Sequence, residues 1–354
     1  MMKLLSHNSS TFLPTSETIL NNTTEWILVH TIVPPYIFTL CVTGLLGNGF
    51  VLLVFLLQRG PCTVPEIYLG NLALADLLLL ACLPFWAMNI LNDFNWPYGD
   101  FLCHIVSQSI LVNTYTSIYL LTMVSVDRYL ALARTIRARW LRRKCYAWVV
   151  CLGLWLFGLL LGVLATVHRK VIFVDRLQTM ACVLEYPDHS TKSWKLANNL
   201  LMNIVGFVLP VIVIISCSGN IIKALWRRRE HVYIEYGNDR KANILIYSVT
   251  LLFLVCWSPF QLFTLIDTLC DAELLDETWH QTLDIGTQFS TYLAFLNSCL
   301  NPVLYVFSGQ YFRKKVSTIY RRTMSRRSSY STAYQLSVVS TYLHRTDQIK
   351  PVVI

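Results

Sequence analysis

Charged residues are scarce in this sequence: they make up 14% of the 354 residues, whereas an average soluble domain has about 25%. This scarcity excludes an ordinary soluble globular protein. Hydrophobic residues make up 55%, gathered in seven blocks of roughly 20 residues or more, enough helix to cross a bilayer core of about 30 Å. We therefore expect an all-α membrane protein, a seven-transmembrane helix bundle. Its spans cover residues 29–57, 66–91, 101–133, 145–167, 196–226, 242–269 and 282–307, and polar residues interrupt the second and the seventh.

Three patterns are also missing. No internal repeat with the period of a solenoid or propeller occurs, which leaves one membrane domain. The first 28 residues lack the apolar core of a signal peptide, so we expect the first span to act as the insertion signal. The 11 cysteines include no Cys-x-x-Cys pair, the histidines are scattered and no nucleophile–base pair stands out, so we expect no metal site of that kind and no enzyme.

Basic residues are concentrated in the loops after the first, third and fifth spans and in the tail. The clusters include Arg59, residues 134–144, Arg227–Arg229 and Arg313–Lys315, whereas the opposite loops hold few lysines or arginines. Cytoplasmic loops carry the excess of Lys and Arg, so the N-terminus is expected outside and the tail in the cytosol. This asymmetry explains the net charge of +9, and nucleic-acid binding is not needed to explain it.

We expect four parts in a multi-pass protein of the plasma membrane. They are an extracellular N-terminal segment at 1–28, the seven-span bundle at 29–307, a short amphipathic membrane-surface helix at 308–319 and a cytoplasmic regulatory tail at 320–354. Basic residues after Phe312 suggest that the short helix lies on the inner leaflet of the lipid bilayer.

Two features mark the outer side of the chain. N-glycosylation sequons begin at Asn8, Asn21 and Asn22 in the N-terminal segment. Cys103 opens the third span on its outer side, and Cys182 lies in the outer loop between the fourth and fifth spans. Because the outer face is oxidising, a disulfide between these two cysteines is chemically permitted, and we predict it.

Several polar residues fall in the middle of spans, where hydrocarbon penalises them unless they face one another. Asp76 is an acid near the middle of the second span, so it needs a proton, a cation or several donors. Asn113 and Ser117 share one face of the third helix, and Asn297 and Ser298 occupy the seventh. These five residues would provide oxygen ligands for a small cation such as Na⁺. The alternative is interhelical hydrogen bonding that only fixes the packing.

Four prolines lie inside spans, at positions 84, 210, 259 and 302, and each removes a backbone hydrogen bond and kinks its helix. Trp257 stands two residues before Pro259, so a bulky aromatic side chain flanks a bend. Such a segment is either a two-state hinge or a static kink.

Asp127, Arg128 and Tyr129 close the third span just before the basic segment 134–144. Charges at the edge of a span are costly to place there and tend to be functional. The triplet is predicted on the cytoplasmic side, where a cytoplasmic partner can bind it.

Motifs fall one per span in an order that resembles the rhodopsin-like (class A) G-protein-coupled receptors, over roughly residues 30–318. They are Gly47-Asn48-Gly49, Leu72–Asp76, Asp127–Tyr129, Trp155, Pro210, Cys256–Pro259 and Asn301-Pro302 through Tyr305. The chain further resembles the bradykinin (kinin) receptors in residues 62–71, 83–86, 94–96, 125–132, 267–269 and 297–302. Leu111 stands where the type 1 receptor has a lysine, so the chain is more similar to type 2.

The resemblance implies a small basic peptide, an arginine-ended kinin, as ligand. The outer ends of the sixth and seventh spans carry acids that attract cations, with no lysine or arginine among them. These acids are Asp267, Asp271, Glu273, Asp276, Glu277 and Asp284. Asp267 and Asp284 match the family's positions that receive arginines, and we expect the other four to be solvated. Further pocket candidates, of which the aromatic ones also fit a membrane belt, are Phe85, Trp86, Trp96, Phe263 and Gln288.

Arg128 is expected to pair with Asp127 and to reach Asp239 at the base of the sixth span. Ligand binding would favour a state in which the sixth helix swings outward about Pro259 and Arg128 meets a G protein. Asn301, Pro302 and Tyr305 belong to the same switch. The resemblance implies a G protein of the Gq class, with phospholipase C and calcium signalling.

The tail offers hydroxyls that receptor kinases would phosphorylate for arrestin, although a merely solvated tail is the alternative at any one of them. These residues are Ser328, Ser329, Ser331, Thr332, Ser337, Ser340 and Thr341.

Two rival functions remain: a receptor for another vasoactive peptide such as angiotensin, and a seven-span transporter. A transporter would need a polar path through the whole bundle, whereas the polar residues here thin out.

Overall fold

The computed structural model describes residues 16–58, 60–133, 142–175, 178–187, 189, 191–228, 236–275, 280–308, 312–325 and 334. Side chains are described from residue 29 onward, except at 132–133, 225–228, 236–246, 280–281, 284 and 307–308 within these ranges.

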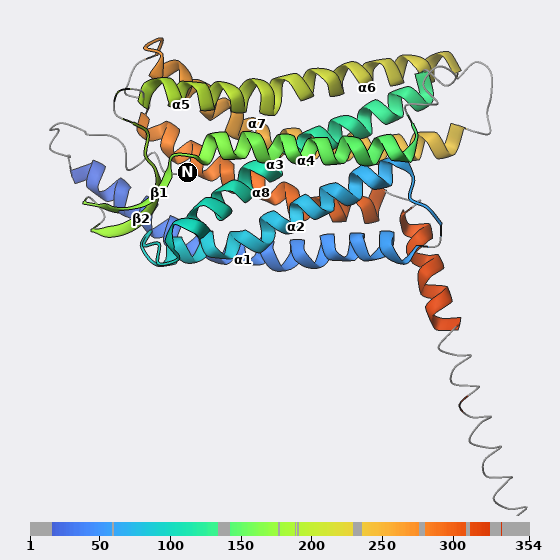
Figure 1. The fold of residues 1–354 in the computed structure, drawn as a ribbon, viewed down its shortest axis with the longest axis horizontal. Coiled ribbons are helices and arrows are strands. Elements are labelled where there is room, and N and C mark those ends of the chain that lie inside the picture. The colour runs from blue at the N-terminus through green and yellow to red at the C-terminus, as the bar shows by residue number, and fades with distance from the viewer. Residues whose placement is uncertain are drawn as a thin grey trace, which may run out of the picture.

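Long helices run side by side through the described residues (Figure 1). They are α1 (Ser16–Leu57), α2 (Val64–Leu91), α3 (Gly99–Ala133), α4 (Lys144–Thr166), α7 (Tyr236–Asp271) and α8 (His280–Ser308), together with one continuous segment. That segment consists of α5 (Thr191–Leu200), the π-helix η1 (Leu201–Val208) and α6 (Leu209–Arg228). A further helix at residues 312–325 leaves the end of the bundle (Figure 1). The predicted seven-helix membrane bundle with a helix after it is confirmed.

Six of these helical segments are long and apolar enough to cross a membrane, counted over the described residues. The second span is one of them despite its polar residues. The seventh long helix, α8, is not, and it carries Gln288, Asn297 and Asn301 along its length. The helix bounds lie close to the predicted spans, except that α1 begins at Ser16, well before residue 29.

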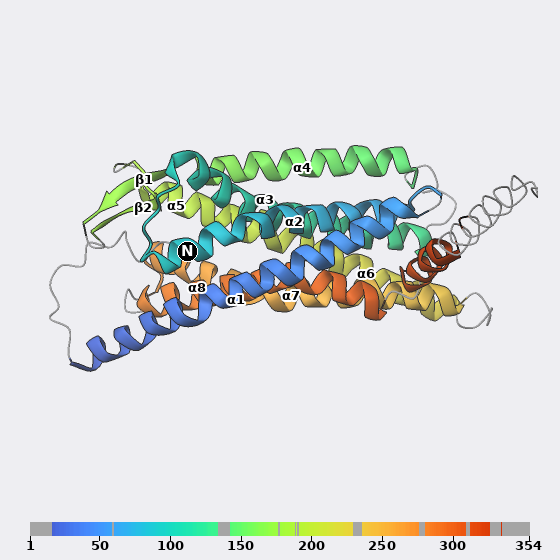
Figure 2. The same cartoon turned by 90° about the horizontal axis from the view of Figure 1, so that it is seen from below.

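α3 is the central helix. It runs obliquely through the bundle and contacts α2, α4, α6 and α7 (Figures 1 and 2). It also has the largest buried share among the spanning segments, whereas α4 and the α5–α6 segment have the smallest. Residues of α3 are therefore placed to connect the two ends of the molecule.

A β-hairpin covers one end of the bundle and was not predicted. β1 (Arg169–Val174) pairs antiparallel with β2 (Thr179–Leu184), and Val171 stands opposite Cys182. The Cys103–Cys182 disulfide joins β2 to the start of α3 and confirms the predicted pairing. Asp100 also accepts a hydrogen bond from the Val171 N–H (2.7 Å). The hairpin and the helix at 312–325 lie at opposite ends of the bundle (Figure 1).

The π-helix η1 widens the fifth segment just before Pro210. π-helical turns are rare and are frequent at functional sites. The Tyr119 hydroxyl of α3 donates a hydrogen bond to the Val205 carbonyl (2.9 Å), and Gly206 faces the Tyr115 ring, where a Cβ would come within 3.0 Å. Two tyrosines of α3 therefore support this irregular turn.

Candidate functional site

A cavity of about 580 Å³ lies under the hairpin, among α3, α5, α7 and α8. Pockets that hold ligands usually measure about 300–1,000 Å³. Its wall is mostly apolar where α3 and the hairpin meet, apart from Ser107, Arg169 and Glu185, and it is more polar along α5 and α8. The lining residues used below are Trp86, Tyr115, Arg169, Lys195, Asn199, Phe260 and Gln288.

Two of the predicted pocket residues, Trp86 and Gln288, line this cavity, and three others do not. The Trp96 Nε1–H donates to the Gly99 carbonyl (3.0 Å), and its ring lies 6.5 Å from Trp86 between centroids. The Phe85 ring contacts Tyr98 edge-on at 5.4 Å. Phe263 packs where Gly286 of α8 approaches α7, and a Cβ on that glycine would collide with the ring. These three aromatic residues support the walls around the cavity.

Arg169 is a cation in the cavity wall that the sequence did not single out. Its Nη1–H group donates to the Cys182 carbonyl at 3.4 Å. Burial lowers the pKa of this guanidinium to about 10, so it remains charged at neutral pH. Burial also raises the pKa of the neighbouring Tyr186 phenol, and this phenol accepts a hydrogen bond from Asn198 Nδ2 (2.8 Å).

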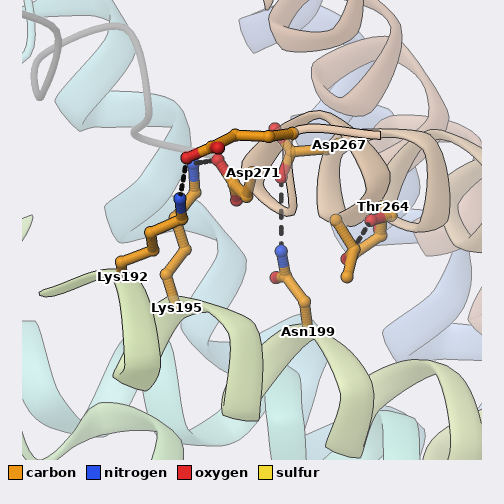
Figure 3. Close-up of polar contacts among 8 residues, drawn as sticks. Lys192, Lys195, Asn199, Thr264, Asp267 and Asp271 are labelled. Atoms are coloured by element: carbon orange, nitrogen blue, oxygen red, sulfur yellow. Dashed lines mark hydrogen bonds and ion pairs between the residues drawn. The ribbon is translucent and has the colours of Figure 1, made fainter. Parts of the chain in front are cut away.

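Asp267 lies directly behind the cavity wall. The side chain is buried, and one carboxylate oxygen accepts a hydrogen bond from Asn199 Nδ2 at 3.2 Å (Figure 3). Since Asn199 lines the cavity, Asp267 is separated from a ligand by a single amide. Asp284 lies within α8, but its side chain is outside the described part of the chain.

Lysines of α5 reach the acids at the end of α7 (Figure 3). Lys195 Nζ lies 2.5 Å from Asp271 Oδ1, and Lys192 Nζ lies 2.6 Å from Glu273 Oε1. The expectation that Asp271 is solvated is wrong, because its side chain is 11% exposed and paired. Glu273 is 80% exposed, and its hydrogen bond to Lys192 lowers the pKa of its carboxyl. The acidic end of the bundle thus contains its own cations.

The predicted mid-span polar residues meet around Asp76, which is fully buried. Asp76 Oδ1 accepts a hydrogen bond from Asn113 Nδ2 (3.0 Å), and Oδ2 accepts one from Asn301 Nδ2 (2.9 Å). Ser298 is buried too, and its carbonyl accepts a hydrogen bond from Asn48 Nδ2 (2.8 Å). One acid therefore joins α2, α3 and α8.

Ser117 and Asn297 are also buried. Ser117 Oγ and Asn297 Oδ1 make no hydrogen bond to any described residue. With Asp76 they supply oxygen ligands of the kind that hard cations prefer. The described residues contain no group of three or more His, Cys, Asp or Glu side chains that would hold a metal ion, so the predicted Na⁺ site depends on this single acid.

Asp127 is buried at the other end of α3 and has two arginines beside it. Arg142 Nε donates to Asp127 Oδ1 at 3.0 Å, while Arg128 Nε lies 3.9 Å from Oδ2. Arg142 belongs to the predicted basic segment, but sequence reasoning gave it no partner. Tyr129 is half-buried beside the pair, and the side chain of Asp239 lies outside the described part of the chain.

The predicted hinge residues pack in a column of aromatic rings. Trp257 stacks on Phe253 at 5.8 Å and meets Phe260 edge-on at 6.0 Å, two residues from Pro259 inside α7. Phe260 lines the cavity. A ligand that moves Phe260 therefore acts directly on the ring beside the bend.

The end of α8 away from the hairpin packs against the following helix. Tyr305 is buried, and its ring lies 6.5 Å from that of Phe312. Pro302 packs so closely on Gly47 of α1 that a Cβ there would approach within 3.1 Å of the proline ring. Lys315, in the helix at 312–325, bonds to both Gln58 and Glu66.

The predicted modification sites lie outside what the structure describes. Asn8 precedes the described residues, and Asn21 and Asn22 fall in α1 where side chains are not described. The same holds for the tail hydroxyls, namely Ser328, Ser329, Ser331, Thr332, Ser337, Ser340 and Thr341.

Residues 47–305, which span nearly the whole bundle, match the family described as 7 transmembrane receptor (rhodopsin family). The chain therefore belongs to the rhodopsin family of seven-transmembrane receptors, and it is a multi-pass membrane protein. This confirms the class predicted from the motifs, and the family is not enzymatic.

Within this family the chain is similar to the bradykinin receptors. It is 41% identical to the B2 bradykinin receptor of Oryctolagus cuniculus over 302 residues, which cover 84% of this chain and 82% of that one. It is 39% identical to the B1 bradykinin receptor of Homo sapiens over 325 residues, 91% of each chain. These values are close, so the greater similarity to type 2 stays a prediction.

Proposed function

We propose that the chain is a plasma-membrane receptor for a kinin or a closely related small basic peptide. The observation that carries the proposal is the cavity at the hairpin end, whose α5 wall is backed by the carboxylates of Asp267 and Asp271. A buried carboxylate favours an arginine, because a guanidinium makes two parallel hydrogen bonds with it. Similarity to bradykinin receptors extends over more than four-fifths of the chain and supports the same ligand class.

Binding would be transmitted from the cavity to the inner end through α7. A peptide that contacts Phe260 shifts the Trp257 ring beside Pro259, and the part of α7 beyond the bend moves with it. The ligand changes the equilibrium only through its different affinity for the two arrangements.

The inner end would couple to a G protein of the Gq class and so to phospholipase C and calcium release. Asp127, Arg142 and Arg128 provide charged groups there, and release of Arg128 from Asp127 makes it available to a helix of the G protein. Receptor kinases would phosphorylate the tail, and arrestin would bind it. Na⁺ would bind at Asp76 as an allosteric ligand.

The orientation follows from the same features. The Cys103–Cys182 disulfide lies at the hairpin end, and disulfides persist in an oxidising compartment. The basic residues of the helix at 312–325 lie at the opposite end. We therefore propose that the hairpin and N-terminus are extracellular and that the tail is cytoplasmic.

Calcium release in transfected cells tests this proposal. Cells that express the full chain are challenged with bradykinin, with angiotensin and with an unrelated basic peptide, and untransfected cells serve as the control. We expect a calcium response to bradykinin alone. A response only to angiotensin, or none to bradykinin despite normal surface expression, would contradict the proposal.

A further inference from the structure

Lys195 of α5 connects the cavity to the acidic end of α7. Its side chain lines the cavity, and its ammonium group lies 2.5 Å from Asp271 Oδ1 (Figure 3). The two side chains are only 20% and 11% exposed. Solvent and salt therefore screen this pair less than a pair on the surface.

Asp271 has an unused hydrogen-bond acceptor behind the cavity wall. Its Oδ2 atom is buried and makes no hydrogen bond to any residue that the structure describes. The ammonium group of Lys195 is a point charge that bonds to one of the two oxygens here. A guanidinium carries two parallel N–H donors that match both oxygens of a carboxylate. An arginine from a ligand thus makes one bond more with Asp271 than Lys195 does.

We propose that Lys195 is a specificity-determining residue of the cavity, an internal competitor that a cationic group of the ligand must displace from Asp271. The inference rests on the proposed function, because it requires a ligand that carries an arginine. A ligand lysine makes the same single bond as Lys195 and gains little from the exchange. A neutral side chain cannot displace Lys195 at all. The pair therefore makes the cavity selective for guanidinium groups.

A neighbouring pair, between α5 and the turn that follows α7, provides a matched control. Lys192 and Glu273 also join α5 to the end of α7, but they are 63% and 80% exposed, and neither lines the cavity. An exposed pair of this kind contributes little energy. Removing the Lys192 charge therefore changes the surface of the same region without changing the cavity.

Competition binding to membranes from cells that express the full chain tests the inference. Three peptides are compared: an arginine-ended kinin, the same peptide with lysine in place of that arginine, and the same peptide with neutral citrulline. In Lys195→Met we expect the affinity for the arginine peptide to rise by about three- to tenfold, since the competing cation is gone and Asp271 needs a new partner. The lysine peptide gains at least as much, and the citrulline peptide changes by less than about twofold. Lys192→Met leaves all three affinities within about twofold of the wild type.

Lys195→Gln is the second variant, in case the methionine variant does not reach the cell surface. An unchanged or lower affinity for the arginine peptide, in a Lys195 variant at normal surface levels, would overturn the inference. An equal gain by the citrulline peptide would also overturn it, because the cavity would then have loosened generally. If the arginine peptide does not bind the wild type, the proposed function itself fails, and this inference fails with it.

Discussion

At the scale of single residues, Asp127 has two arginine neighbours, which lie at different distances from its carboxylate. Arg142 Nε is 3.0 Å from the carboxylate and Arg128 Nε is 3.9 Å from it. A buried carboxylate needs a cation, so the two guanidinium groups share one acceptor. We therefore expect Arg142 to influence how tightly Arg128 is held at this end of α3.

Arg142→Ala is expected to lower agonist-driven nucleotide exchange on added G protein by about three- to tenfold, roughly what 1 kcal/mol produces. Without Arg142, the carboxylate draws Arg128 closer and keeps it from the G protein. Arg142→Lys retains a cation and should stay near the wild type. Exchange at or above the wild-type rate in Arg142→Ala, with normal surface expression, would show that the Arg142 contact has no such role.

At the scale of elements, Glu66 has two functions at the start of α2. Its Oε2 accepts a hydrogen bond from the Thr63 N–H at 2.8 Å and completes a capping box, while Oε1 pairs with Lys315. Phe312 packs against Phe50 and Phe55 of α1 in the same region. The helix at 312–325 is thereby fixed to the end of α1 and the start of α2.

Glu66→Ala should destabilise the receptor more than Lys315→Met does. The alanine loses the helix cap, about 1 kcal/mol, and also the ion pair, about another 1 kcal/mol. Lys315→Met loses the pair and the hydrogen bond to Gln58, but it keeps the cap. Glu66→Gln keeps an oxygen for the Thr63 N–H and should resemble Lys315→Met. The measurement is the Tm of the purified receptor in detergent. Equal Tm values for Glu66→Ala and Lys315→Met would rule out the separate capping contribution.

Hydropathy and charge predicted the long helices well. Each residue of a span adds to the hydropathy of that span whatever the rest of the fold is. The disulfide also followed from the sequence, since Cys103 and Cys182 were both expected on the oxidising side. The hairpin was missed because Arg169–Val174 and Thr179–Leu184 form strands only when paired with each other. The Lys195–Asp271 and Arg142–Asp127 pairs were missed for a related reason. Their partners meet only when the chain is folded, and the composition of neither segment predicts such a contact.

At the scale of the whole molecule, α2, α3 and α8 are joined at Asp76. A bound Na⁺ would hold this packing and so oppose the arrangement that an agonist favours. Replacing Na⁺ by choline at constant ionic strength is expected to raise agonist affinity in the wild type and to leave it unchanged in Asp76→Asn. If wild-type affinity is the same in both salts, the Na⁺ site is disproved.

The central claim is that carboxylates at the hairpin ends of α7 and α8 bind a basic peptide. It is tested most directly by saturation binding of a labelled arginine-ended kinin to cells that express the wild type or the double variant Asp267→Lys/Asp284→Lys, with surface expression measured in parallel. Each lost charge-assisted hydrogen bond is worth about 1.5–3 kcal/mol, so affinity should fall by at least about a hundredfold at equal surface levels. Unchanged affinity in the double variant would contradict the claim.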